Sequence, residues 1–175
     1  MALERLSYEG DMRTSAVLVV AIFVLIAMGM DASATPPSGL AVAIERAPST
    51  GKPSREKATW LAETFGASCD EPWLAAAISW MTSGFRDKAV GVKGLGLMGL
   101  NPDYTPPKVA LDPARAIPAG CSKMTYWSMW HEVNCHVAHD WLVHYSGGYK
   151  VVKRAIASAA LVRDRLRRLH ELGGV

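Results

Sequence analysis

Between residues 131 and 144 the sequence gathers side chains that bind metal ions or transfer protons in proteins. They are His131, Glu132, Cys135, His136, His139, Asp140 and His144. If this stretch is helical, His136, His139 and Asp140 share one face. His131 and Glu132 resemble the start of the zinc-protease motif His-Glu-x-x-His, but position 135, where that motif requires histidine, is Cys135. We therefore expect hydrogen-bonded surface or groove histidines here, with no metal ion or other cofactor; metal binding is the alternative.

The cysteines offer a second kind of chemistry. Cys69, Cys121 and Cys135 allow one disulfide and one remaining thiol, and a disulfide is expected if the chain is exported. Cys121 and Cys135 flank the same predicted helical hairpin but stand at different heights along it. The sequence therefore leaves the pairing open.

A series of short motifs runs along the middle of the chain. Residues 72–85 read PWLAAAISWMTSGF, residues 89–90 read AV, and residues 94–98 read GLGLM. Downstream, residues 112–120 read DPARAIPAG and residues 144–148 read HYSGG. In this order and near this spacing, the motifs resemble the lytic transglycosylase domain of the lysozyme-like superfamily. That domain has a helix ending in Glu-Ser-x-Phe, an Ala-Val loop, a Gly-Leu-Met-Gln turn, an Asp-Pro helix start and an Ala-Tyr-Asn-Ala-Gly segment.

The resemblance covers about residues 57 to 160 and implies both a fold and an activity. Lytic transglycosylases cleave the glycan strand of peptidoglycan with one carboxyl group, which protonates the glycosidic oxygen and then assists closure of an anhydro ring. Thr82 stands at the position of that glutamate. A threonine hydroxyl exchanges no proton in the useful pH range, and loss of a general acid typically removes about 10²–10⁴ in rate. The resemblance thus implies a catalytic position that is not functional in this chain.

Another carboxylate is the alternative. Asp87 lies five residues after Thr82, in the following loop, and with it as acid the chain would be an active lytic transglycosylase. Glu71 lies about 16 Å away at the other end of the same helix, at 1.5 Å rise per residue. Glu132 and Asp140 are expected on later helices as surface or capping residues.

The resemblance also implies residues that line a glycan groove. These are Ser83, Met98, Tyr145 and Ser146, each equally explained by helix-end or core packing. Ser146 replaces the family's asparagine, and Gly99 replaces the glutamine of the Gly-Leu-Met-Gln turn. Several departures in one groove favour a naturally degenerate site.

The elements that must position these residues are helical. Apolar residues recur at steps of three and four, and strand-like alternation of useful length is absent from the sequence. Capping signals place helices at about 55–65, from Asp70 to Gly84, from Asp112 to about Trp130, from an Asn134 cap to Gly147, and within 150–175. Residues 86–111 are expected to be loop. The fold class is therefore all-α.

Length and composition set the scale of this fold. The chain has 175 residues, enough for one ordinary domain, and 50% hydrophobic residues with 20% charged exclude a disordered or collagen-like protein. We expect a linker over 35–53 and the lysozyme-like helical domain over 54–175. Residues 150–175 contain seven basic and two acidic residues. They predict a solvated helix face, and the alternative is a contact with anionic cell-wall polymer or lipid.

Residues 15–30 read SAVLVVAIFVLIAMGM and contain no charged side chain. This length lies between a signal-peptide core and a comfortable membrane span. Ala32 and Ala34 form a small-x-small cleavage pattern, so residues 1–34 are expected to be either a signal peptide or a membrane anchor. A buried core helix is the third alternative.

Together these features predict an exported protein of the periplasm or cell envelope, or of a virion membrane. Its expected role is a non-catalytic, peptidoglycan-binding or structural component. The partners expected are glycan strands, the membrane through residues 15–30, and proteins of an envelope or virion assembly, with no nucleic acid. A pure protein-interaction module is the remaining alternative.

Overall fold

The structure is a computed structural model, and it describes residues 36–91, 94–135, 140–149 and 152–175. The apolar segment 15–30, the cleavage pattern at 32–34, and His136 and His139 lie outside these residues. Within the described ranges the chain forms helices and no strand, which confirms the all-α class. The helices are α2 (Leu40–Arg46), α3 (Arg55–Ser68), α4 (Pro72–Ser83), α5 (Pro107–Ala110), α6 (Pro113–Asn134), α7 (Leu142–Gly147) and α8 (Lys153–Gly173). None of them is both long and apolar enough to cross a membrane.

Helix α2 lies within the segment that was expected to be a linker. Leu40, Ala43 and Ile44 are fully buried, and the helix packs against α3 and α8. The Ala-, Ser- and Gly-rich composition of this stretch resembles a linker, but the spacing of these three residues gives a short apolar face. Residues 40–46 therefore belong to the folded unit.

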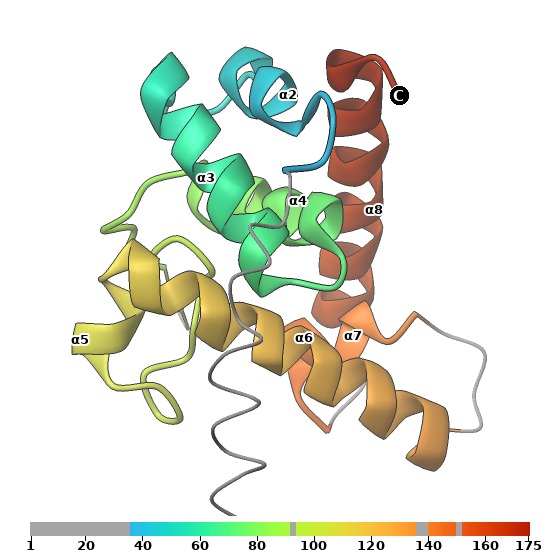
Figure 1. The fold of residues 1–175 in the computed structure, drawn as a ribbon. Helices are drawn as coiled ribbons and strands as arrows, with labels where there is room; N and C mark the ends of the chain where they lie inside the picture. The colour runs from blue at the N-terminus through green and yellow to red at the C-terminus, as the bar shows by residue number, and fades with distance from the viewer. Residues whose placement is uncertain (1–35, 92–93, 136–139, 150–151) are drawn as a thin grey trace, which may run out of the picture. The chain divides into compact units, whose positions relative to one another are not determined.

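Helix α4 occupies the centre of the fold. Its residues 74 to 80 are all buried, and it packs against α3 and α8 (Figure 1). Pro72 stands in its first turn and Glu71 is the N-cap, one residue after the expected cap at Asp70. The helix ends where predicted, because Gly84 adopts a left-handed conformation with φ of 60°.

After α4 the chain forms a compact turn. Leu95 makes isolated antiparallel bridges with Val90 and with Leu100, and Leu97 and Met98 between them are fully buried. Helix α5 follows inside the region expected to be loop. The turn is thus part of the core, although it contains little regular structure.

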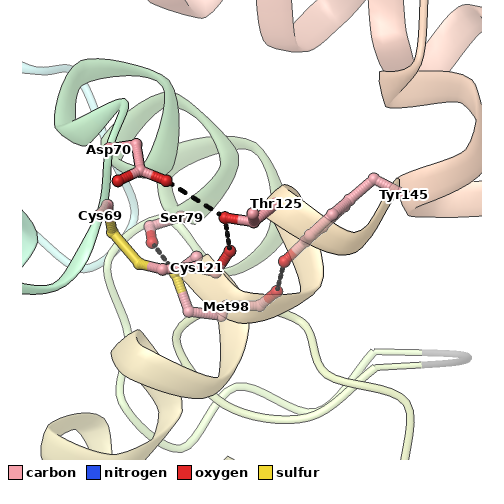
Figure 2. Close-up of a disulfide and its surroundings, with 7 residues drawn as sticks. All are labelled: Cys69, Asp70, Ser79, Met98, Cys121, Thr125 and Tyr145. Carbon is pink, nitrogen blue, oxygen red and sulfur yellow. Dashed lines mark hydrogen bonds between the residues drawn. A yellow bond between two sulfur atoms is a disulfide. The ribbon is translucent and has the colours of Figure 1, made fainter. Parts of the chain in front are cut away.

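Helix α6 begins as predicted, because the Asp112 carboxylate accepts a hydrogen bond from the Ala114 amide at 3.1 Å. It continues to Asn134, four residues beyond the expected end. The predicted helix start at Asn134 is wrong, since its side-chain amide donates to the carbonyl oxygen of Trp130 at 3.0 Å within α6. A disulfide joins Cys121 of α6 to Cys69, between α3 and α4 (Figure 2).

Helix α8 forms the predicted basic C-terminal helix and packs against α2, α4 and α7 (Figure 1). Its buried face consists of Ala155, Ala159, Val162 and Leu169. Ile156 is 49% exposed. The buried face thus includes two alanines, whose small side chains allow the helix to pack closely on its neighbours.

Candidate functional site

Thr82, the residue at the expected catalytic position, lies in the last turn of α4. Its hydroxyl oxygen is 2.8 Å from the carbonyl oxygen of Ile78 and 3.1 Å from that of Leu97. A hydroxyl has one proton to donate, so these two carbonyl groups share it. The side chain thus fastens the end of α4 to the turn that follows, and it has no carboxyl group to protonate a leaving oxygen.

Gly99 packs directly against Thr82. Its φ is 59°, and a Cβ atom built on it would lie 2.9 Å from the Cβ and Cγ2 atoms of Thr82. Side chains larger than hydrogen are strained in this conformation and lack space at this position. Thr82 and Gly99, which both differ from the motifs that the sequence resembles, are therefore neighbours in the folded chain.

The residues expected to line the groove are mostly inside the protein. Ser83 is 2% exposed and Met98 is fully buried. The Ser83 hydroxyl donates to the Ser79 carbonyl oxygen at 2.8 Å, and the Ser79 hydroxyl donates to the Met98 sulfur at 3.0 Å (Figure 2). Tyr145 donates its hydroxyl to the Met98 carbonyl oxygen at 3.2 Å (Figure 2). The structure thus brings these residues together as a buried hydrogen-bonded set between α4, the turn and α7.

Tyr145 and Ser146 differ in exposure although they are adjacent. Tyr145 is 6% exposed, and burial raises the pKa of its hydroxyl above the usual range. Ser146 is exposed, with its hydroxyl 3.3 Å from the Leu142 carbonyl oxygen. Of the four expected groove residues, Ser146 is the one whose side chain faces solvent.

Asp87, the alternative acid, is held in an ion pair. Its Oδ1 atom accepts a hydrogen bond from the ammonium group of Lys57 at 2.8 Å, and both side chains are partly buried. This contact ties the loop after α4 to the first turn of α3.

Lys123 is a residue that sequence reasoning missed. Its ammonium nitrogen lies 4.2 Å from the ring centroid of Tyr145, and burial lowers the pKa of its side chain to about 8. The cation–π contact favours the charged form, but the cost of removing the ammonium from water is larger. An isolated lysine among Ser, Met and Thr residues gives no signal in the sequence, because its burial arises from the packing of α6 on α7.

A cavity of about 110 Å³ lies beside the disulfide, among Cys69, Asp70, Thr125 and Trp141 with neighbouring residues of α6. Asp70 accepts a hydrogen bond from the Thr125 hydroxyl at 3.3 Å (Figure 2). The residues expected to form a glycan site do not line this cavity.

Among the described residues of the histidine- and cysteine-rich stretch, three side chains come together. Ligand atoms of His131, Cys135 and His144 lie within 4.8 Å of one another. Glu132 is exposed, and Asp140 forms a two-point ion pair with Arg163 at 2.6 and 3.1 Å. Burial opposes the charged form of Asp140, but the hydrogen bonds from Arg163 and the Leu142 amide, together with the charge of Arg163, outweigh it and lower the pKa of the carboxyl group.

Two exposed tyrosines and the two tryptophans that contact them lie next to this stretch. Tyr126 and Tyr149 are 48% and 64% exposed, and their hydroxyl oxygens lie 2.7 Å apart. Trp127 and Trp130 contact the Tyr149 ring at centroid distances of 5.0 and 5.3 Å. We call Tyr126, Trp127, Trp130 and Tyr149 the aromatic platform.

Arginines in the second half of α8 make contacts within the protein. Arg167 pairs with Asp164 and Glu171, Arg168 pairs with Asp164, and Arg165 lies over the ring of Trp80 at 4.3 Å. These contacts favour the solvated helix face over a surface dedicated to anionic polymers.

Comparison of the chain with protein-family models, with curated proteins and with solved structures found no match.

Proposed function

We propose that this protein is a peptidoglycan-associated, lytic-transglycosylase-like component that binds glycan strands without cleaving them. The proposal rests on the resemblance of its motifs and on one observation in the structure, the engagement of Thr82. Its role would then be structural or adhesive, in a cell envelope or in a virion that crosses the wall.

The hydrogen bonds of Thr82 support the absence of catalysis. Cleavage by this route needs an acid that delivers a proton to the glycosidic oxygen. Thr82 lacks a carboxyl group, and its hydroxyl is directed at the carbonyl oxygens of Ile78 and Leu97. Position 82 thus contributes to the contact between α4 and the following turn.

The ion pair of Asp87 argues against the alternative acid. Lys57 is 2.8 Å away, so a role of Asp87 as the acid would compete with the ion pair that links α3 to the loop. The active-enzyme alternative therefore has no observation in its favour.

The aromatic platform is the surface that suits a glycan. Sugars bind to aromatic rings through their C–H faces while their hydroxyl groups bond to polar edges, and tyrosine offers both a ring face and a hydroxyl. Tyr126 and Tyr149 expose their rings, and Trp127 and Trp130 hold Tyr149 from behind. Because Ser83, Met98 and Tyr145 are buried, we propose that the aromatic platform contacts the glycan instead of these residues.

The disulfide agrees with the proposed location. Cys69 and Cys121 have their Cα atoms 5.1 Å apart and close a loop with a sequence separation of 52. Disulfides persist in oxidising compartments, which is where an exported wall protein would fold. We propose that residues 15–30 direct the chain to the membrane, as a signal peptide or an anchor.

The test is co-sedimentation of the full chain with purified peptidoglycan sacculi. We expect binding that Tyr149→Ala weakens and Tyr104→Ala preserves, because Tyr104 is an 87% exposed tyrosine outside the platform. Absence of binding by the unmodified chain would overturn the glycan-binding role and favour a protein-interaction module.

A further inference from the structure

The end of α6 and helix α7 together present three side chains with soft or borderline metal-binding atoms. His131 and Cys135 are one helical turn apart, and the Cys135 amide donates to the His131 carbonyl oxygen at 2.9 Å. His144 comes from α7. The imidazole and thiol ligand atoms of all three lie within 4.8 Å of one another.

The imidazole of His144 is oriented as a metal-binding histidine would be. Its Nδ1 atom lies 2.8 Å from the carbonyl oxygen of Gly148, and since a carbonyl only accepts, Nδ1 donates. In the neutral ring this leaves the lone pair on Nε2. A backbone carbonyl that fixes the tautomer in this way is the usual outer partner of a ligating histidine.

Aromatic rings shield the same imidazole from solvent. His144 is 1% exposed, with the Trp127 ring stacked at a centroid distance of 5.7 Å and the Trp130 ring at 4.9 Å. The His131 ring lies 5.6 Å from it. An apolar wall on one side of a donor cluster lowers competition from water for the metal.

We propose that His131, Cys135 and His144 bind one Zn²⁺ ion through two imidazole nitrogens and one thiolate sulfur. Zinc–nitrogen bonds of about 2.0–2.1 Å and a zinc–sulfur bond of about 2.3 Å place tetrahedral ligands about 3.3–3.6 Å apart. Separations of up to 4.8 Å would need to close by at most about 1.2–1.5 Å, which side-chain rotation can supply. Three protein ligands leave the fourth position for water or a small ligand.

Cysteine at position 135 is therefore a ligand in this proposal, although it breaks the zinc-protease motif. The spacing of four residues from His131 is the same, and the third ligand comes from the next helix. The Cys69–Cys121 disulfide leaves Cys135 in the thiol form. On binding, the thiol proton passes to the buffer and a sulfur–zinc bond replaces the sulfur–hydrogen bond.

The experiment is titration of the full chain, with its disulfide intact, by Co²⁺ as a spectroscopic substitute and then by Zn²⁺. We expect one equivalent to bind, a thiolate-to-cobalt charge-transfer absorption to appear, and Zn²⁺ to displace it. Cys135→Ser should abolish that absorption. His131→Gln should weaken Zn²⁺ affinity by more than about 100-fold, because loss of an outer-shell partner alone costs about 10–100-fold.

Two control variants and one measurement on the unmodified chain complete the test. Glu132→Gln, next to a ligand, and His170→Gln, on α8, should leave the stoichiometry and the absorption unchanged. Zn²⁺ should also slow alkylation of the Cys135 thiol in the unmodified chain, which needs no folded variant. The proposal is overturned if no thiolate absorption appears, if binding survives both ligand substitutions, or if Zn²⁺ leaves the alkylation rate unchanged.

Discussion

Thr82 at the end of α4 and Gly99 in the following turn lie so close that a Cβ atom at position 99 would be 2.9 Å from the Cβ and Cγ2 atoms of Thr82. The same threonine shares its hydroxyl proton between the carbonyl oxygens of Ile78 and Leu97. The position that the resemblance assigns to catalysis thus serves to hold the helix and the turn together.

The first prediction concerns this contact. Gly99→Ala should lower the free energy of unfolding by about 2–5 kcal/mol, because the left-handed conformation costs about 1–2 kcal/mol and the forced contact about 1–3 kcal/mol. Chemical denaturation measures the change. Gly174→Ala is the matched control, since Gly174 is also left-handed, with φ of 77°, but has open space around it. Adding Thr82→Ser removes one of the two contact atoms and should recover part of the loss; full additivity of the two substitutions would contradict the contact.

The second prediction concerns α2. Leu40→Ala should lower the free energy of unfolding by about 2–5 kcal/mol, because Leu40 is fully buried and the substitution leaves a cavity. Val42 in the same helix is 40% exposed, so Val42→Ala should lower the free energy of unfolding much less. Equal, small effects in denaturation experiments would show that residues 40–46 act as a linker.

The third prediction concerns the disulfide. Replacing Cys69 and Cys121 together by serine should lower the free energy of unfolding by about 2–5 kcal/mol, because the unfolded chain gains conformational freedom when the long loop is released. Thermal and denaturant unfolding without reductant measure the loss. Cys135→Ser should leave stability in the absence of metal nearly unchanged, and a loss as large as that of the double variant would point to a different pairing.

The fourth prediction concerns Lys123 and pH. Burial lowers the pKa of its side chain from 10.5 to about 8. The folded chain therefore binds fewer protons than the unfolded chain between these values, and the unfolding free energy should rise with pH over that window. The cost of the buried charge is fully present below pH 8.

Lys123→Met isolates this effect because it removes the charge and keeps an unbranched apolar side chain. The variant should be more stable than the unmodified chain at pH 7, and the difference should shrink as pH rises from about 8 to 10.5. Parallel denaturation series across that range provide the comparison. A difference that is constant with pH would show that Lys123 is not the group responsible.

Much of the scaffold could be predicted from local signals. Pro72 and Gly84 bound α4, and Asp112 with Pro113 begins α6, because proline and glycine restrict backbone angles and aspartate caps free amide groups. The apolar period found α3, α4 and α8. Helix α2 was missed because its core face is only three residues long and lies in a segment with linker-like composition.

The site was less predictable, because its properties depend on contacts between distant segments. The sequence left Met98 and Tyr145 open between a glycan groove and core packing, and the structure places both in the core, where the Tyr145 hydroxyl contacts the Met98 carbonyl oxygen. The predicted face of His136, His139 and Asp140 lies mostly outside the described residues, and within them a donor cluster forms between the end of α6 and α7, which the sequence did not indicate. Which side chains are exposed, and which distant residues contact each other, is decided by how the helices pack.

The central claim is tested most directly by incubating the full chain with purified sacculi and measuring both the bound protein and the released muropeptides. Thr82→Glu, assayed in parallel with an active lytic transglycosylase as a positive control, shows whether restoring a carboxyl group at position 82 restores cleavage. The unmodified chain should sediment with the sacculi and release no anhydro-muropeptides. Release of anhydro-muropeptides by the unmodified chain would contradict it.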